Sequence, residues 1–178
     1  DYFLSPTSVS QYLGAASSAK QYVDDTDEAY CCVGFWNTLK TFRTAVAKAK
    51  QNGYTTVNIV GMCWMQGEND VITNGSPAIY DKLLANFITD MRNYLEIPTL
   101  SFAIGLAQAP TENMPEIADE LAIVQAAQRK VANNDNCAML VDTSDLTRIP
   151  TDHWHYDTTS MLQLGQRFAQ AIILLNTK

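Results

Sequence analysis

The sequence has few charged residues, and fewer of those are basic than acidic. Lysine, arginine, aspartate and glutamate make up 17% of its 178 residues, whereas about 25% is usual for a soluble protein. Twelve basic against 19 acidic residues give a net charge of −7. A chain this acidic lacks the positive surface that holds nucleic acid or anionic lipid. We therefore expect neither nucleic acid nor a membrane among its partners.

Long apolar runs are also missing. The nearest approach is Ala171 to Leu175, far short of the roughly 20 residues that a membrane span needs. The first residues, Asp1 to Pro6, lack the basic start and apolar run of a signal peptide. The four cysteines form no C-x-x-C pair, which removes the usual signals of a zinc ribbon or a redox site.

The length and composition suit one globular domain. Apolar residues make up 47% of the chain, and a chain of this size buries roughly 70% of its unfolded surface. No internal repeat, low-complexity tract or linker divides it. We expect residues 1–178 to belong to a single domain.

The spacing of apolar residues changes repeatedly between helical and strand periods. Short apolar runs predict buried parallel strands, and stripes such as Leu83, Phe87 and Met91 predict helices between them. Ser76-Pro77 is typical of a helix start, with Ser76 as the cap. We predict strands over 57–64, 99–106 and 137–141, and helices over 7–23, 36–52, 76–94, 117–131 and from Asp157 or Thr158 onward.

This alternation predicts an α/β protein with a parallel sheet. Ligands of such sheets bind beyond the carboxyl ends of the strands. Three loops should therefore share one rim: Trp64 to Gly75, Ala107 to Pro115 and Asp142 to Tyr156.

Both histidines lie in the last of these loops. Asp152 and His155 are three residues apart, so the carboxylate can orient the imidazole as in the acid and base half of a catalytic triad. A solvated surface loop is an equal alternative on this motif alone. Metal binding by His153 and His155 with Asp152 or Asp157 is a weaker alternative because no spaced third ligand accompanies them, so we predict no metal.

The first rim loop reads Trp64-Met65-Gln66-Gly67-Glu68-Asn69-Asp70. The amide of Gln66 could donate to an oxyanion, Gly67 could admit a substrate, and Glu68 or Asp70 could orient neighbours. An ordinary turn explains the loop when it is taken alone. Its place on the same rim as Asp152 and His155 favours a site.

A nucleophile is harder to find. The chain has no G-x-S-x-G motif, and Ser76, Ser101 and Ser144 offer no substitute. Cys63, at the end of a strand, is the one internal candidate, although a cysteine there is usually a small core residue.

Two blocks of the chain together resemble a known family. Trp64 to Asp70 is similar to the W-x-Q-G-E-x-D block of sialic-acid-specific acetylesterase-like domains, which include carbohydrate esterase family six of the SGNH-hydrolase superfamily. Asp152-x-x-His155-Tyr156, followed by Leu164 to Ala169, resembles their terminal D-x-x-H-Y block. Val124-Gln125-Ala126-Ala127-Gln128 and Leu140 to Thr143 lie between them, and the resemblance runs from about Trp36 to the end.

The resemblance implies a flavodoxin-like three-layer α/β/α fold and a serine esterase that removes O-acetyl groups from sialic acid, xylan or another glycan, without a cofactor. His155 would be the general base, Asp152 its orienting acid and Gln66 an oxyanion donor. Gly67 and Glu68 would be neighbouring site residues, and acetylated sugar would lie over Gly67 and the 107–115 loop. Export from the cytoplasm, to the periplasm or outside the cell, would fit such a substrate.

The family's opening strand, which ends in Gly-Gln-Ser-Asn and supplies the nucleophile, has no counterpart here. We expect the chain to be the C-terminal portion of a longer domain whose first strand is missing from this sequence. The alternatives are an inactive carbohydrate-binding relative and a cysteine hydrolase that uses Cys63.

Overall fold

The computed structural model describes residues 5–12, 33–73 and 76–177. The chain divides into two compact units, with α5 (Tyr80–Leu95) crossing the division. We call Asp1–Ile59 with Lys82–Thr99 the helical unit, and Val60–Asp81 with Leu100–Lys178 the sheet unit. All the candidate site residues belong to the sheet unit.

The helical unit contains α1 (Pro6–Tyr12), α3 (Val33–Gln51) and most of α5. The buried ring of Phe35 makes edge contacts with Phe87 and Tyr94, at centroid distances of 5.8 and 5.6 Å. The helix predicted over 36–52 is confirmed. The helix predicted over 7–23 is observed as α1, and residues 13–23 lie outside the described residues.

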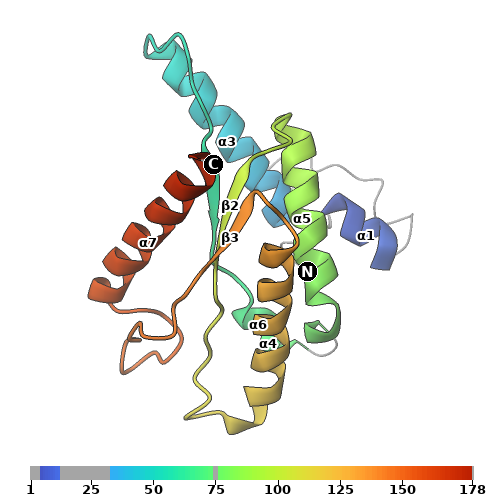
Figure 1. The fold of residues 1–178 in the computed structure, drawn as a ribbon, viewed down its shortest axis with the longest axis vertical. Coiled ribbons are helices and arrows are strands. Elements are labelled where there is room, and N and C mark those ends of the chain that lie inside the picture. Colours follow the sequence, from blue (N-terminus) through green and yellow to red (C-terminus); the bar gives the residue numbers. More distant parts are fainter. Residues whose placement is uncertain (1–4, 13–32, 74–75, 178) are drawn as a thin grey trace. The chain divides into compact units, whose positions relative to one another are not determined.

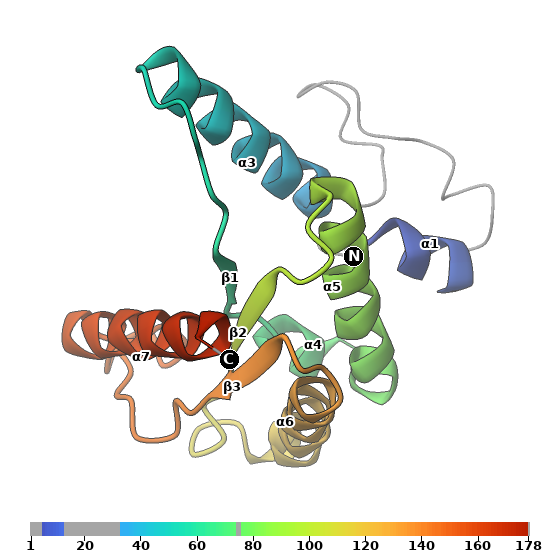
Figure 2. The same cartoon turned by 45° about the horizontal axis from the view of Figure 1, so that its top comes forward.

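The sheet unit is built on three parallel strands in the order β1-β2-β3. They are β1 (Gly61–Trp64), β2 (Ser101–Gly105) and β3 (Ala138–Val141). Helix α7 (Thr158–Asn176) covers one face and α6 (Ala118–Asn133) lies on the other (Figures 1 and 2). The sheet with helices on both faces confirms the expected three-layer α/β/α fold.

The two faces of the sheet are packed by alternate residues of the strands. On the α7 side, Ala103 and Val141 form a core cluster with Leu164, Phe168 and Ala171. On the other side, Phe102 and Ile104 of β2 are fully buried. A short apolar strand that is buried on both faces is what a parallel sheet requires.

Strand β1 is shorter than expected. The apolar run predicted a strand over 57–64, but pairing begins at Gly61, opposite Ser101, the first residue of β2. Val60, just outside, is 58% exposed. Among the described residues, β1 pairs with β2 alone, so one of its edges is unpaired.

Short helices occupy parts of the predicted loops. Helix α4 (Glu68–Ile72) lies within the loop expected over 64–75, and the 3₁₀ helices η1 (Pro77–Ile79) and η2 (Pro115–Ile117) precede α5 and α6. The described helices include none that is both long enough and apolar enough to cross a membrane.

Candidate active site

Asp152 and His155 form a hydrogen-bonded pair in the loop between β3 and α7. The distance from Asp152 Oδ2 to His155 Nδ1 is 2.6 Å, and the His155 side chain is 79% exposed. The imidazole hydrogen bond, and then the main-chain N–H of Trp154, lower the pKa of the Asp152 carboxyl. With Nδ1 held by the carboxylate, Nε2 is the nitrogen that can exchange a proton with a substrate.

The main chain of this loop explains how the pair is held. Arg148 and Tyr156 form an antiparallel bridge, and the N–H of Ile149 donates to the carbonyl of His155 at 2.8 Å. Asp152 Oδ1 also accepts from the N–H groups of Trp154 and His155, at 3.0 and 3.2 Å. The pair therefore lies on a closed turn.

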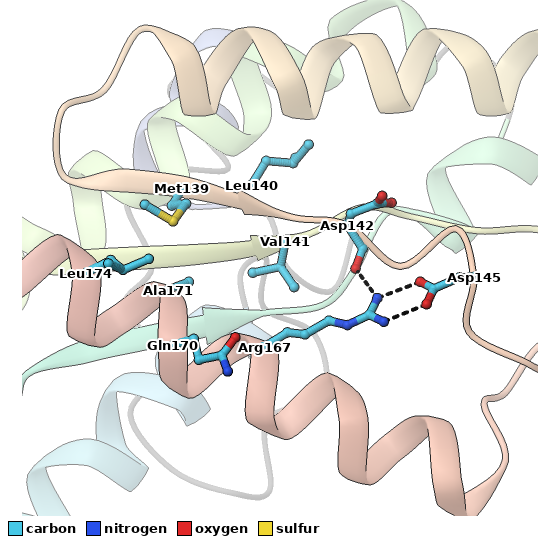
Figure 3. Close-up of a pocket in the computed structure, with 9 residues that line it drawn as sticks. All are labelled: Met139, Leu140, Val141, Asp142, Asp145, Arg167, Gln170, Ala171 and Leu174. Atoms are coloured by element: carbon cyan, nitrogen blue, oxygen red, sulfur yellow. Dashed lines mark hydrogen bonds and ion pairs between the residues drawn. The ribbon is translucent and has the colours of Figure 1, made fainter.

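Helix α7 holds both ends of the segment between β3 and α7. At its start, the Asp157 side chain caps the helix by accepting from the Ser160 N–H at 2.8 Å. The sequence had predicted a helix start at Asp157 or Thr158. Further along, Arg167 donates to both carboxylate oxygens of Asp145 at 2.6 Å and to the carbonyl of Asp142 at 2.8 Å (Figure 3).

A hollow of about 420 Å³ lies beside this arginine, between β3 and α7 (Figure 3). None of the predicted site residues lines it. The lining residues are Met139, Leu140, Val141, Asp142, Asp145, Arg167, Gln170, Ala171 and Leu174.

The amide of Gln66 is held from both sides. Its Nε2 donates to Asp70 Oδ2 at 2.5 Å, and the buried hydroxyl of Tyr80 donates to the Gln66 main-chain and side-chain oxygens, at 2.9 and 3.1 Å. Burial raises the pKa of Tyr80, so this hydroxyl stays protonated and remains a donor. Because a carboxylate only accepts, these partners fix which end of the amide carries the N–H groups.

Ser76 acts differently from the predicted helix cap. It precedes Pro77 of η1, but its backbone is helical and its side chain makes no capping hydrogen bond. The hydroxyl donates instead to Asp70 Oδ1. Ser76 thus supports the carboxylate that holds Gln66.

Gly67 packs tightly against other residues of the protein. It is buried at φ +137°, a conformation that favours glycine. A Cβ there would lie 3.0 Å from both Ala107 and Val124 and 3.2 Å from the Tyr80 hydroxyl. Gly67 therefore allows close packing within the protein, and its expected place beside the substrate stays a prediction.

Glu68 connects the two rim motifs electrostatically. Burial, chiefly, and the charge of Asp70 raise the pKa of its carboxyl, while its own main-chain hydrogen bond and His155 act in the opposite direction. Glu68 also contributes to the raised pKa of Tyr156, which burial dominates. The Gln66 loop and the His155 loop thus act on each other across one rim.

The third predicted loop joins the same rim. Glu112 pairs with Arg148 at 2.6 Å, which connects the 107–115 loop to the histidine loop. Sequence reasoning missed two further residues, Tyr80 and Gln128, which hydrogen bond to Gln66. Gln128 lies in the recognised V-Q-A-A-Q block, whereas nothing in the sequence pointed to Tyr80.

Cys63 has little of the character of a reactive thiol. Its side chain is exposed, contrary to the core position expected for it, because β1 lies at a sheet edge. Partial burial raises its pKa, whereas reactive cysteines have a lowered one. The described residues also contain no group of three or more histidine, cysteine, aspartate or glutamate residues placed to hold a metal ion.

Comparison with family models now decides the family. Residues 31–174 match the model described as carbohydrate esterase, sialic acid-specific acetylesterase. The chain belongs to this family. Both blocks that resemble the acetylesterase family, Trp64 to Asp70 and Asp152 to Tyr156, lie within the matched residues.

A solved structure supports the fold of this family member. It is an X-ray structure of a protein from Arabidopsis thaliana, with a TM-score of 0.63, 21% identity, and coverage of 82% of this chain and 53% of that one. The acetylesterase-family chain thus spans about half the length of that protein. Comparison with curated protein sequences gave no match.

Proposed function

We propose that the chain forms the histidine-bearing part of a carbohydrate O-acetylesterase. The observation that carries this proposal is the Asp152–His155 pair, 2.6 Å apart, with an exposed imidazole. The pair lies on the rim that also presents Gln66. A base held by a carboxylate and an amide donor on the same rim are the groups that acyl transfer needs.

The reaction begins when His155 Nε2 takes the proton of a serine hydroxyl and the serine oxygen attacks the acetyl carbonyl carbon. The free N–H of Gln66 stabilises the oxyanion. His155 then gives its proton to the sugar oxygen as the C–O bond breaks, leaving an acetyl-serine. Water, activated by the same imidazole, releases acetate.

We further propose that the serine is supplied by a segment of the protein outside this sequence. The unpaired edge of β1 fits this proposal, because exposed strand edges are normally paired or covered in native proteins. The exposed Cys63 lies on that strand. A parallel strand at this edge would end on the same rim as Gln66.

The substrate class that we propose is an acetylated sugar with no charge or a single carboxylate, such as xylan or sialic acid. The net charge of −7 suits a sugar ester better than a polyanion. A location outside the cytoplasm would fit a glycan substrate.

Acetate release from an acetylated glycan or an aryl acetate by the whole protein tests the proposed reaction. His155→Ala should lower kcat by about 10²- to 10⁴-fold, the usual contribution of a general base. His153→Ala, two residues away in the same loop, is the matched control and should retain activity. Equal activity of wild type and His155→Ala would refute the proposal, and a wild type that binds glycan without releasing acetate would favour the carbohydrate-binding alternative.

Thiol labelling tests the proposed strand separately. In the 1–178 chain, Cys63 should react with iodoacetamide, and in the whole protein the added strand should protect it. Peptide mapping distinguishes Cys63 from the other cysteines, and the half-buried Cys137 serves as the reference. Inactivation of the whole protein through modified Cys63 would instead support a cysteine hydrolase.

A further inference from the structure

Gln128 is the one glutamine of the described chain whose side chain is fully buried, at 0% exposure, and it comes from α6. A buried amide is costly unless each of its polar atoms is hydrogen bonded. Here each of them is. The Oε1 atom accepts from the Ala107 N–H at 2.8 Å, and Nε2 donates to the carbonyls of Gln66 at 2.9 Å and Gly105 at 3.2 Å.

These partners are main-chain groups at the ends of two neighbouring strands. Gln66 follows β1, and Gly105 and Ala107 lie at and just beyond the end of β2. Where the sheet pairing stops, a single side chain supplies two donors and one acceptor to both segments. Among uncharged side chains of this length, only glutamine offers that combination.

We propose that Gln128 is a positioning residue for the esterase reaction. By holding the Gln66 carbonyl against the end of β2, it sets the position from which the Gln66 amide reaches the acetyl group. Asp70 and Tyr80 orient that amide, and Gln128 fixes the main chain that bears it. This inference rests on the proposed function, in which Gln66 stabilises the oxyanion.

Two substitutions in the whole protein distinguish the acceptor and the donor functions of the Gln128 amide. Gln128→Met keeps the volume and removes all three hydrogen bonds. Gln128→Glu keeps an acceptor for the Ala107 N–H but turns a carboxylate oxygen toward the two carbonyls. Gln125→Met is the matched control on the same helix, because Gln125 donates only to the Ala107 carbonyl at 2.8 Å and does not reach Gln66.

Both Gln128 variants should lower kcat roughly 10- to 100-fold while KM changes less than about threefold. The reason is that a displaced Gln66 amide stabilises the transition state less well, whereas it affects substrate binding less. Gln125→Met should retain kcat. Hydrogen exchange at the Ala107 N–H should become faster in Gln128→Met and stay slow in Gln128→Glu.

Wild-type kcat in a folded Gln128→Glu variant would overturn the proposal, as would an equal loss of kcat in Gln125→Met. A wild-type protein without esterase activity would refute the proposed function instead. Hydrogen exchange at Ala107 would still report whether Gln128 holds the strand ends together, and unchanged exchange in Gln128→Met would refute that as well.

Discussion

The two rim loops of the candidate site are built in opposite ways. The loop after β1 is largely enclosed: Gln66 contacts the buried Tyr80 and Gln128, and Gly67 packs against Val124. The loop before α7 projects its histidine into solvent, with 79% of the His155 side chain exposed. We call them the amide loop (66–70) and the histidine loop (147–157).

The difference matches what each loop has to do. A donor to an oxyanion must be fixed before the reaction, because rearranging it later costs part of the stabilisation. A base that exchanges protons with serine, sugar and water must be accessible to all three. The amide loop therefore depends on burial and side-chain hydrogen bonds, whereas the histidine loop depends on main-chain hydrogen bonds and the one hydrogen bond between Asp152 and His155.

Asp152→Asn in the whole protein should have the largest effect on activity and little effect on stability. Asparagine can still accept the main-chain N–H groups of the turn, but it cannot stabilise the imidazolium, so kcat should fall about 10²- to 10⁴-fold. The Tm should change little because the loop is exposed. Steady-state kinetics and thermal unfolding check the two halves, and a large fall in Tm would contradict the description of this loop.

Gln66→Leu should lower both the activity and the stability of the protein. Removing the amide should lower kcat by about 10²- to 10³-fold, as for other oxyanion donors. It also removes one hydrogen-bond partner from the Asp70 carboxylate and one from the buried Tyr80 hydroxyl, which should cost about 1–3 kcal/mol of unfolding free energy. Urea unfolding measures this loss. If the stability were unchanged, the amide loop would not be held as described.

Glu68→Gln should have the smallest effect of the three substitutions. It should change the stability of the amide loop in a way that depends on pH. The pKa of Glu68 is raised in the folded chain, so the ionised carboxyl destabilises the fold at pH values above its unfolded pKa. The glutamine variant should therefore have a higher Tm than wild type at pH 7, and the difference should vanish as the pH falls below the unfolded pKa. Asn69→Asp, an exposed neighbour, tests for general charge effects. A lower Tm for Glu68→Gln at pH 7 would contradict this reading.

The sequence predicted the elements around the site well because the apolar periodicity of each is strong. Helix α7 begins at Thr158 behind its Asp157 cap, and the Asp152–His155 pair has the expected geometry. The pair was predictable because both partners lie within one turn, so a spacing of three residues is enough to define it.

The amide loop was less predictable because its order comes from residues distant in the chain. Gln66 is held by Tyr80, 14 positions away, and by Gln128, 62 positions away. The start of β1 was misplaced because an apolar run does not reveal where its partner strand begins. Likewise, the exposure of Cys63 follows from the place of β1 in the sheet, which local sequence does not encode.

The most direct test is to identify the residue of the whole protein that a serine-reactive alkyl phosphonate modifies. We expect a single adduct on a serine outside residues 1–178, located by peptide mass spectrometry. The adduct should be lost in His155→Ala and retained in His153→Ala. An adduct on Cys63, or one that forms equally well without His155, would contradict the proposed active site.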